Sequence, residues 1–163
     1  HEVDVLILAT GFKVMDVDSL TYEITGRGGM TMSQFWKENR LQAYEGVSLP
    51  GFPNFFTVAG PYGFNGASFF AYIETQTHHI VRCLKEAARR RSLRVEVTTA
   101  ANDRYFAEML RKRHTQIFWQ DSCALANSYY FDSHGDVPLR RATTLETIWR
   151  SRRFPLDDYA FTA

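Results

Sequence analysis

Cysteine is scarce in this sequence, which also has almost no net charge and no long hydrophobic run. The two cysteines, Cys83 and Cys123, make neither a metal-ligand spacing nor a disulfide framework, so we expect both to be reduced residues of a cytoplasmic protein. The formal net charge of +1 gives no electrostatic reason to expect a nucleic acid or an acidic membrane as a partner. No apolar run is long enough to cross a bilayer, and no signal-peptide pattern is present.

Glycine-rich phosphate-binding loops are missing as well. Dinucleotide-binding domains hold the pyrophosphate of their cofactor with a Gly-x-Gly-x-x-Gly loop between a strand and a helix, and the sequence contains no such pattern. The glycine cluster at 26–29 lacks that setting and is predicted to form a plain turn. The chain starts at His1 without a methionine and enters an apolar segment almost at once, so we expect a piece of a longer protein.

Aromatic residues, in contrast, are plentiful. Thirteen Phe, eight Tyr and three Trp in 163 residues argue against disorder and provide for one sizeable buried core. The basic residues gather at 89–91, at 111–113 and between Arg140 and Arg153. These three groups are predicted to be solvated helix ends and faces.

The hydrophobic pattern predicts two buried strands and one long helix. Residues 3–9 and 55–59 form short, β-branched or aromatic apolar runs, each ended by glycine, as in a parallel sheet covered on both faces. A helix is predicted over 67–89 because apolar residues recur there at three- and four-residue steps. Its inward stripe is predicted to be Phe70, Ile73, Thr77, Ile80, Leu84 and Ala87.

Shorter elements complete the expected α/β pattern. Residues 16–27 are predicted to be a loop or a weak hairpin. Helices are expected from Thr31 or Ser33 to Lys37, over 103–119, and from Thr143 or Thr144 through Trp149. Strands are expected over 93–97 and 128–131.

The segment from the second strand to the long helix is the best candidate for a ligand site. A strand, a break at Gly60 and Pro61, and a helix bring free backbone N–H groups to the carboxyl end of a sheet, where α/β folds bind ligands. A helix start also stabilises negative charge. The alternative is a loop that merely caps a structural helix.

Three pieces of the sequence together resemble the class B flavoprotein monooxygenases, which include Baeyer–Villiger and flavin-containing monooxygenases. They are residues 4–12 (DVLILATGF), residues 51–61 (GFPNFFTVAGP) and residues 73–76 (IETQ). The tail resembles the acetophenone-monooxygenase-like branch in the run 144–154 and at five other positions, Trp119, Ser122, Cys123, Tyr129 and Gly135. The resemblance covers essentially the whole chain.

The resemblance implies the C-terminal part of a Rossmann-like fold with two dinucleotide domains for FAD and NAD(P), followed by a helical C-terminal extension. Residues 1–92 correspond to the C-terminal piece of the FAD-binding domain, and residues 93–163 to the extension. The implied enzyme uses FAD, NADPH and O2, and inserts one oxygen atom into a ketone, or onto nitrogen or sulfur, through a flavin C4a-peroxide. The implied partners are the remaining N-terminal part of the enzyme and a small organic substrate.

The resemblance also assigns site residues. The Ala-Thr-Gly strand is where the family's chain returns to the FAD domain, and Gly11 permits close approach to the cofactor, unless it simply ends a packed strand. Residues 62–68 are implied to face the pyrimidine edge of the flavin ring. The expected cofactor-binding residues are Thr10, Gly11, Gly60, Pro61, Tyr62, Asn65 and Gly66.

No catalytic residue is expected within the chain, because the family's nucleotide loops and the arginine near the flavin lie upstream. Where relatives often carry Ser-Trp-Tyr, this sequence has Ser128-Tyr129-Tyr130, so the substrate preference cannot be transferred. His78 and His79 are adjacent on a helix and point in different directions, which argues against a metal site.

Two other functions stay open. The chain without its nucleotide loops could act as a non-catalytic binding or interaction module. A different two-dinucleotide flavoprotein, such as a reductase, would share the Ala-Thr-Gly strand, but Cys83 and Cys123 show no redox motif. We also expect the chain to expose apolar faces and to self-associate.

Overall fold

The computed structural model describes residues 2–9, 15, 17, 22–120 and 128–163. Its regular elements are the helices α1 (Met32–Asn39), α2 (Phe69–Arg90), α3 (Thr99–Lys112) and α4 (Thr144–Arg153), and the strands β1 (Arg94–Val97) and β2 (Tyr159–Thr162). Single turns of 3₁₀ helix lie at Arg27–Gly29, Arg113–Thr115, Ile117–Trp119 and Leu156–Asp158. None of the helices in this part of the chain is long and apolar enough to cross a membrane.

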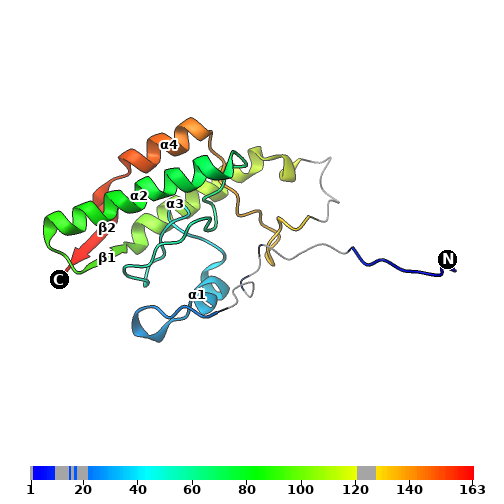
Figure 1. Ribbon diagram of the computed structural model, residues 1–163, viewed down its shortest axis with the longest axis horizontal. Coiled ribbons are helices and arrows are strands. Elements are labelled where there is room, and N and C mark those ends of the chain that lie inside the picture. Colours follow the sequence, from blue (N-terminus) through cyan, green and yellow to red (C-terminus); the bar gives the residue numbers. More distant parts are fainter. Residues whose placement is uncertain (1, 10–14, 16, 18–21, 121–127) are drawn as a thin grey trace.

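Three helices and a two-stranded ribbon form the main body. Helices α2, α3 and α4 run alongside one another, and β1 and β2 lie at one end of them (Figure 1). The strands pair antiparallel, with Val97 opposite Tyr159 and Arg94 opposite Thr162. The core of this body contains Tyr44, Tyr62, Cys83, Ala87, Val95, Val97, Ala101, Tyr105, Met109, Phe154 and Tyr159.

A second, smaller core forms around α1. Trp36 and Met32 of the helix pack there with Leu41, Leu49 and Phe52. The helix begins with a capping box, because the Thr31 hydroxyl accepts from the backbone of Gln34 while the Gln34 side chain accepts from the backbone of Thr31. Thr31, rather than Ser33, is therefore the cap among the two predicted candidates.

Several predicted elements are confirmed. Helix α2 agrees with the predicted helix to within two residues at its start and one at its end, and β1 lies within the predicted strand 93–97. Helix α4 is capped by Thr143, whose hydroxyl accepts from the N–H of Glu146 at 3.1 Å. The helix predicted over 103–119 starts earlier, because Thr98 caps it, and ends at Lys112.

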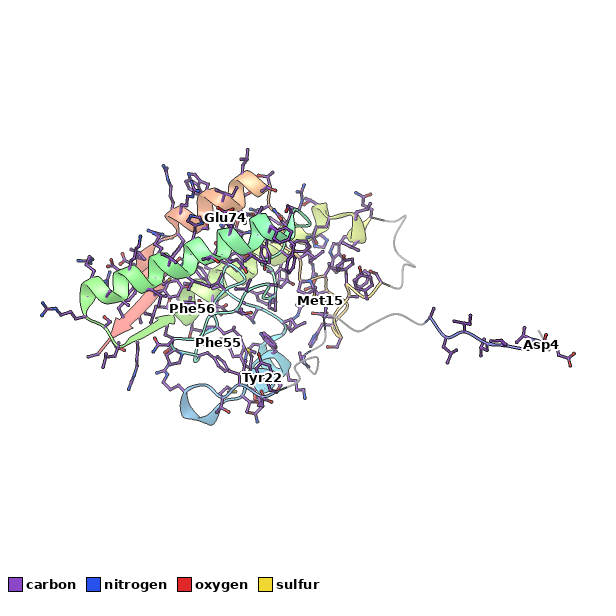
Figure 2. The ribbon with its side chains drawn as sticks, viewed as in Figure 1. Asp4, Met15, Tyr22, Phe55, Phe56 and Glu74 are labelled. Carbon is purple, nitrogen blue, oxygen red and sulfur yellow. The ribbon has the colours of Figure 1, made fainter. Side chains whose placement is uncertain are left out.

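The two strands predicted to be buried are wrong for this structure. Residues 3–9 extend away from the body with their side chains in solvent, as Asp4 shows in Figure 2, and residues 55–59 form no ladder. A parallel strand needs hydrogen-bonded neighbours, and the described residues supply none for either segment. The strand predicted over 128–131 is also wrong, since residues 129 and 130 form a turn.

The inward stripe predicted for the long helix is mostly on its outer face. The buried residues of α2 are Tyr72, Thr75, Gln76, His79, Cys83 and Ala87. Of the predicted stripe only Ala87 is buried, whereas Phe70 is 84% exposed and Leu84 is 51% exposed. The helix thus turns a partly polar face to the core and leaves apolar side chains outside.

Candidate functional site

The loop between residues 60 and 68 connects the second core to α2 and is packed closely against Gly46. The N–H of Gly60 donates to the Gly46 carbonyl at 3.2 Å. A Cβ on Gly60 would lie 2.6 Å from that oxygen, and a Cβ on Gly46 would lie 2.1 Å from Cα of Gly63. Gly60, predicted to bind the cofactor, is therefore in close contact with the chain's own backbone.

The side chain of Gln76, on the buried face of α2, makes two hydrogen bonds to the backbone beside this loop. Its Nε2 donates to the Gly46 carbonyl at 3.0 Å, and its Oε1 accepts from the N–H of Ala59 at 2.8 Å. Gln76 lies in the family motif at 73–76, and no site role was predicted for it. Gln76 lies on the same helix face as Tyr72, His79 and Cys83, which are buried. Its spacing from these residues is the sequence signal that could have indicated a buried, hydrogen-bonded side chain.

Tyr62 lies in the interior. Its hydroxyl donates to Asp136 at 3.1 Å, and its carbonyl accepts from the hydroxyl of Tyr105 at 2.6 Å. Burial, followed by the charge of Asp136, raises the pKa of Tyr62 above its usual value, so the phenol stays neutral. The backbone of Tyr62 has a φ of 56°, and its side chain points away from the loop into the core.

Asn65 and Gly66 shape the turn into α2. The Asn65 Oδ1 accepts from the N–H of Ala67 at 3.2 Å, while its Nδ2 donates to the Ala142 carbonyl at 3.3 Å and to Thr147 Oγ1 at 3.4 Å. Gly66 has a φ of 80°, and a Cβ built there would meet nothing within 4 Å. Space is therefore open beside Gly66, whereas the neighbouring Asn65 is fixed to α4.

Among the described residues, no side chain caps the start of α2. Ser68 occupies the N-cap position, but its hydroxyl makes no capping bond, and the first turn contains no acidic residue. Phe69 and Phe70 at this end are exposed. The partial positive charge of the helix start is thus available to an acceptor from outside these residues.

A cleft of about 420 Å³ lies next to this turn. Phe64, Asn65 and Gly66 form one side, and residues 115–118 and 139–142 form the other. Gln116 is held by a bond from its Nε2 to the Leu139 carbonyl at 3.0 Å, and its buried Oε1 has no partner within the described part of the chain. The turn that the sequence singled out therefore borders a ligand-sized space.

The other predicted site residues and candidates have different surroundings. Thr10, Gly11 and Cys123 lie outside the described residues. Glu74 is exposed on α2 (Figure 2), and His78 is exposed as well. No group of three potential metal ligands occurs within the described ranges.

His79 is buried and serves the core. Its ring stacks on Phe154 with the centroids 3.7 Å apart, and its Nε2 lies 2.7 Å from the hydroxyl of Tyr159. Burial, followed by the charges of Arg140 and Arg82, lowers the pKa of His79 to about 3. The imidazole is therefore neutral at physiological pH.

The prediction that the third basic group is solvated is wrong for two of its members. Arg140 is buried and is paired with the buried carboxylate of Glu45, and Arg150 pairs with the same carboxylate at 2.6 Å. Two guanidinium groups thus compensate one buried acid, which a count of charges along the sequence cannot reveal. The exposed arginines at 89–91 agree with the prediction.

Comparison with known proteins identifies relatives along most of the chain. An uncharacterized monooxygenase of Mycobacterium tuberculosis is 34% identical over 140 residues, 83% of this chain and 26% of the relative. A Baeyer–Villiger monooxygenase of Pseudooceanicola batsensis is 38% identical over 103 residues, 63% of this chain and 18% of the relative. No family model matches the sequence.

The fold has a counterpart in solved structures. A mutant cyclohexanone monooxygenase from Rhodococcus sp. Phi1, bound to NADP⁺, superposes with a TM-score of 0.73 at 26% identity. The match covers 100% of this chain and 30% of that one. The chain therefore spans about a quarter of the length of the proteins it matches, and its relatives include enzymes named Baeyer–Villiger monooxygenase and cyclohexanone 1,2-monooxygenase.

Proposed function

We propose that this chain is part of an FAD- and NADPH-dependent monooxygenase that inserts one oxygen atom from O2 into a ketone. The observation that carries the proposal is the uncapped start of α2 beside the open cleft at Asn65 and Gly66, in a chain whose named relatives are monooxygenases. Oxidation of a nitrogen or sulfur atom in place of a ketone is compatible with the same residues.

In this proposal, the turn at Asn65 and Gly66 would form one edge of a flavin site. Bound FAD, once reduced by NADPH, supplies the electrons that activate O2. Reduction places negative charge on the pyrimidine edge of the ring, and the start of α2 would stabilise that charge. Gly66, with no side chain, would leave room for the ring, and Asn65 would hold the turn in place through its bonds to Ala142 and Thr147.

Tyr62, Gly60 and Pro61 would support this turn from behind, because Tyr62 is anchored to Asp136 and Gly60 to Gly46. Their proposed role is to fix the loop, with at most backbone contact to the cofactor. Thr10 and Gly11, outside the described residues, are proposed to contact the cofactor from the end of the 3–9 segment.

The rest of the enzyme would supply the strand neighbours that residues 3–9 do not have among the described residues. The large apolar side chains of residues 3–9 are 63–85% exposed. Such exposure is expected of a segment whose neighbouring strands are absent. We propose that 3–9 and 55–59 join a Rossmann-like sheet from the remaining part, that residues 1–92 complete the FAD domain, and that 93–163 form its extension. The main core contains residues from both sides of residue 92, so the two segments would fold together.

A cytoplasmic location also stays a prediction.

A chimaeric enzyme tests the proposal. This chain would replace the matching segment of the Rhodococcus cyclohexanone monooxygenase. That segment is 30% of the enzyme and aligns with 100% of this chain at 26% identity. We expect bound flavin by visible absorbance, and NADPH oxidation that depends on a ketone and yields its ester. A folded chimaera that binds no flavin would contradict the proposal, and one that binds flavin but oxidises only amines or sulfides would assign heteroatom oxidation.

A further inference from the structure

Asp136 is a buried carboxylate that precedes one wall of the cleft at Asn65 and Gly66. It is 1% exposed, and the wall formed by residues 139–142 follows it in the sequence. Asp136 does not line the cleft itself. The proposed function uses it only as an anchor for Tyr62, but its contacts extend to two further elements.

Side chains from three separate parts of the fold converge on this carboxylate. Arg40, the residue that ends α1, and Arg113, the residue that ends α3, both pair with Asp136. The hydroxyl of Tyr62 donates to it at 3.1 Å, and the Arg113 Nη1 lies 3.3 Å from each carboxylate oxygen. Two guanidinium groups and a phenol thus compensate one buried charge, which would otherwise be costly to bury.

The backbone that follows Asp136 joins two walls of the cleft. The N–H of Tyr62 donates to the Pro138 carbonyl at 2.7 Å. The N–H of Arg140 donates to the Phe64 carbonyl at 2.8 Å. Since Phe64 and Arg140 lie on opposite sides of the cleft, these bonds hold the two sides together at its inner end.

Each segment that lines the cleft begins two or three residues after a member of this cluster. Residues 64–66 follow Tyr62, residues 115–118 follow Arg113, and residues 139–142 follow Asp136. The carboxylate therefore joins the three segments at the points where they enter the cleft.

We propose that Asp136 is a positioning residue, which sets the separation of the cleft walls by holding their three segments together. It acts on a ligand only through these segments, because it does not line the cleft. The effect on the walls rests on the contacts of the described residues, whereas an effect on FAD also rests on the proposed function.

Amide hydrogen exchange of the full chain, followed by NMR, tests the effect on the walls. Asp136→Asn removes the charge and nearly keeps the size of the side chain. Relative to the amides of α2, those of Tyr62 and Arg140 should exchange about tenfold faster, because the two arginines no longer hold these segments to a carboxylate.

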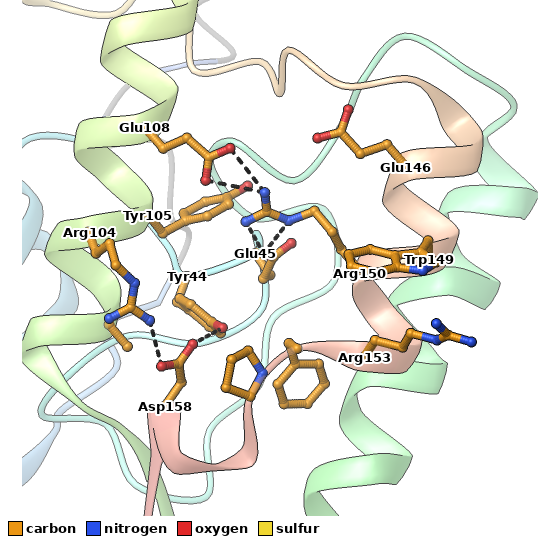
Figure 3. A pocket seen from close by; sticks show the side chains of 13 residues that line it. Tyr44, Glu45, Arg104, Tyr105, Glu108, Glu146, Trp149, Arg150, Arg153 and Asp158 are labelled. Carbon is orange, nitrogen blue, oxygen red and sulfur yellow. Dashed lines mark hydrogen bonds and ion pairs between the residues drawn. The ribbon is translucent and has the colours of Figure 1, made fainter.

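Asp158→Asn is the matched control. Asp158 is also buried, and it accepts from the hydroxyl of Tyr44 and from Arg104, both at 2.5 Å (Figure 3). It therefore has the same kinds of partner, but neither it nor these partners line the cleft at Asn65. The control should lower overall stability as well, and leave the relative exchange of the Tyr62 and Arg140 amides within about twofold of the wild type.

Tyr62→Phe decides the matter if Asp136→Asn does not fold. It removes one hydroxyl from the cluster and keeps the carboxylate with both arginines. The relative exchange of the Arg140 amide should rise about threefold, as suits the loss of one hydrogen bond. Wild-type exchange in the folded variants, or equal acceleration by Asp158→Asn, would overturn the proposal.

The chimaeric enzyme tests the effect on the cofactor. Asp136→Asn should weaken FAD binding about tenfold, because the walls no longer keep one geometry, and Asp158→Asn should leave it unchanged. Equal FAD affinity in the two variants would overturn the role toward the cofactor. A parent chimaera without flavin would instead contradict the proposed function, while the exchange rates would still decide whether Asp136 positions the walls.

Discussion

Gly46 and Gly66 both have positive φ angles, of 71° and 80°, but their surroundings differ. A Cβ on Gly46 would meet the backbone of Gly63, whereas a Cβ on Gly66 would enter open space. We predict that Gly66→Ala costs about 1 kcal/mol of unfolding free energy from backbone strain alone. Gly46→Ala should cost about 2–3 kcal/mol more because the loop must move.

Urea denaturation of the two variants measures this difference. Since both positions carry the same conformational strain, the Gly66 variant is the control for it. Equal losses of stability would mean that close packing of Gly46 against residues 60–63 does not fix this loop. That result would contradict the description of the candidate site.

His79 makes the stability of the protein depend on pH. Its folded pKa of about 3 lies below the ordinary 6.5, so the unfolded chain binds the proton first as the pH falls. Stability is therefore complete above about pH 6.5 and declines below it, by about 2 kcal/mol between pH 6.5 and about pH 5. The variant His79→Phe keeps a ring against Phe154 and cannot titrate.

Thermal or urea unfolding over this pH range should show a smaller decline for His79→Phe than for the wild type. The variant also loses the bond to Tyr159, so its stability should be lower at neutral pH. Parallel pH profiles for the two proteins would show that His79 is not the group responsible.

At the scale of elements, the exposed face of α2 is the feature that calls for a partner. Phe70, Val81 and Leu84 lie on it in solvent, and a helix that is apolar on its outer face as well as its inner one is normally covered on both. We predict that the chain self-associates through this face. Phe70→Lys with Leu84→Lys should change unfolding free energy by less than about 0.5 kcal/mol each and raise the monomer fraction.

Sedimentation velocity over a range of concentrations measures the association. Leu145→Lys, on an exposed position of α4, is the matched control and should leave the profile unchanged. Clean monomer for the wild type at high concentration would refute self-association.

The sequence predicts three of the elements: helix α2, helix α4 with its threonine cap, and strand β1. These could be predicted because caps and apolar spacing are local signals. The strands at 3–9 and 55–59 could not form here, because strand pairing depends on neighbours that a local pattern does not contain. Strand β2 was missed for a related reason, since Tyr159–Thr162 is stabilised by its pairing with β1. The buried face of α2 was misassigned because apolar spacing marks both faces of a helix that packs on two sides.

The candidate site was predicted only in part. Asn65 and Gly66, which precede α2, border a cleft, and their contact with a cofactor stays a prediction. Tyr62 faces the interior, and the tie from Gln76 to Gly46 was not foreseen. Such contacts join residues far apart in sequence, which no local pattern specifies.

At the scale of the whole molecule, the proposed function gives the chain one edge of a cofactor site. We predict that the isolated chain is purified without colour and does not oxidise NADPH, because the turn at Asn65 cannot enclose a flavin ring by itself. Absorbance spectra of the purified protein check this. Stoichiometric FAD in that material would mean that the chain forms a complete site.

The charge at the start of α2 tests the central claim most directly. In the chimaeric enzyme, Ser68→Asp places a carboxylate at the N-cap, where it also stabilises the helix. Thr98→Asp does the same at the start of α3, away from the cleft, as a control. If α2 faces the flavin, Ser68→Asp should make the midpoint potential of the bound flavin more negative, because it disfavours the negatively charged reduced form, while Thr98→Asp should leave it in place. A potential that is equal in both variants and in the parent chimaera would contradict the account.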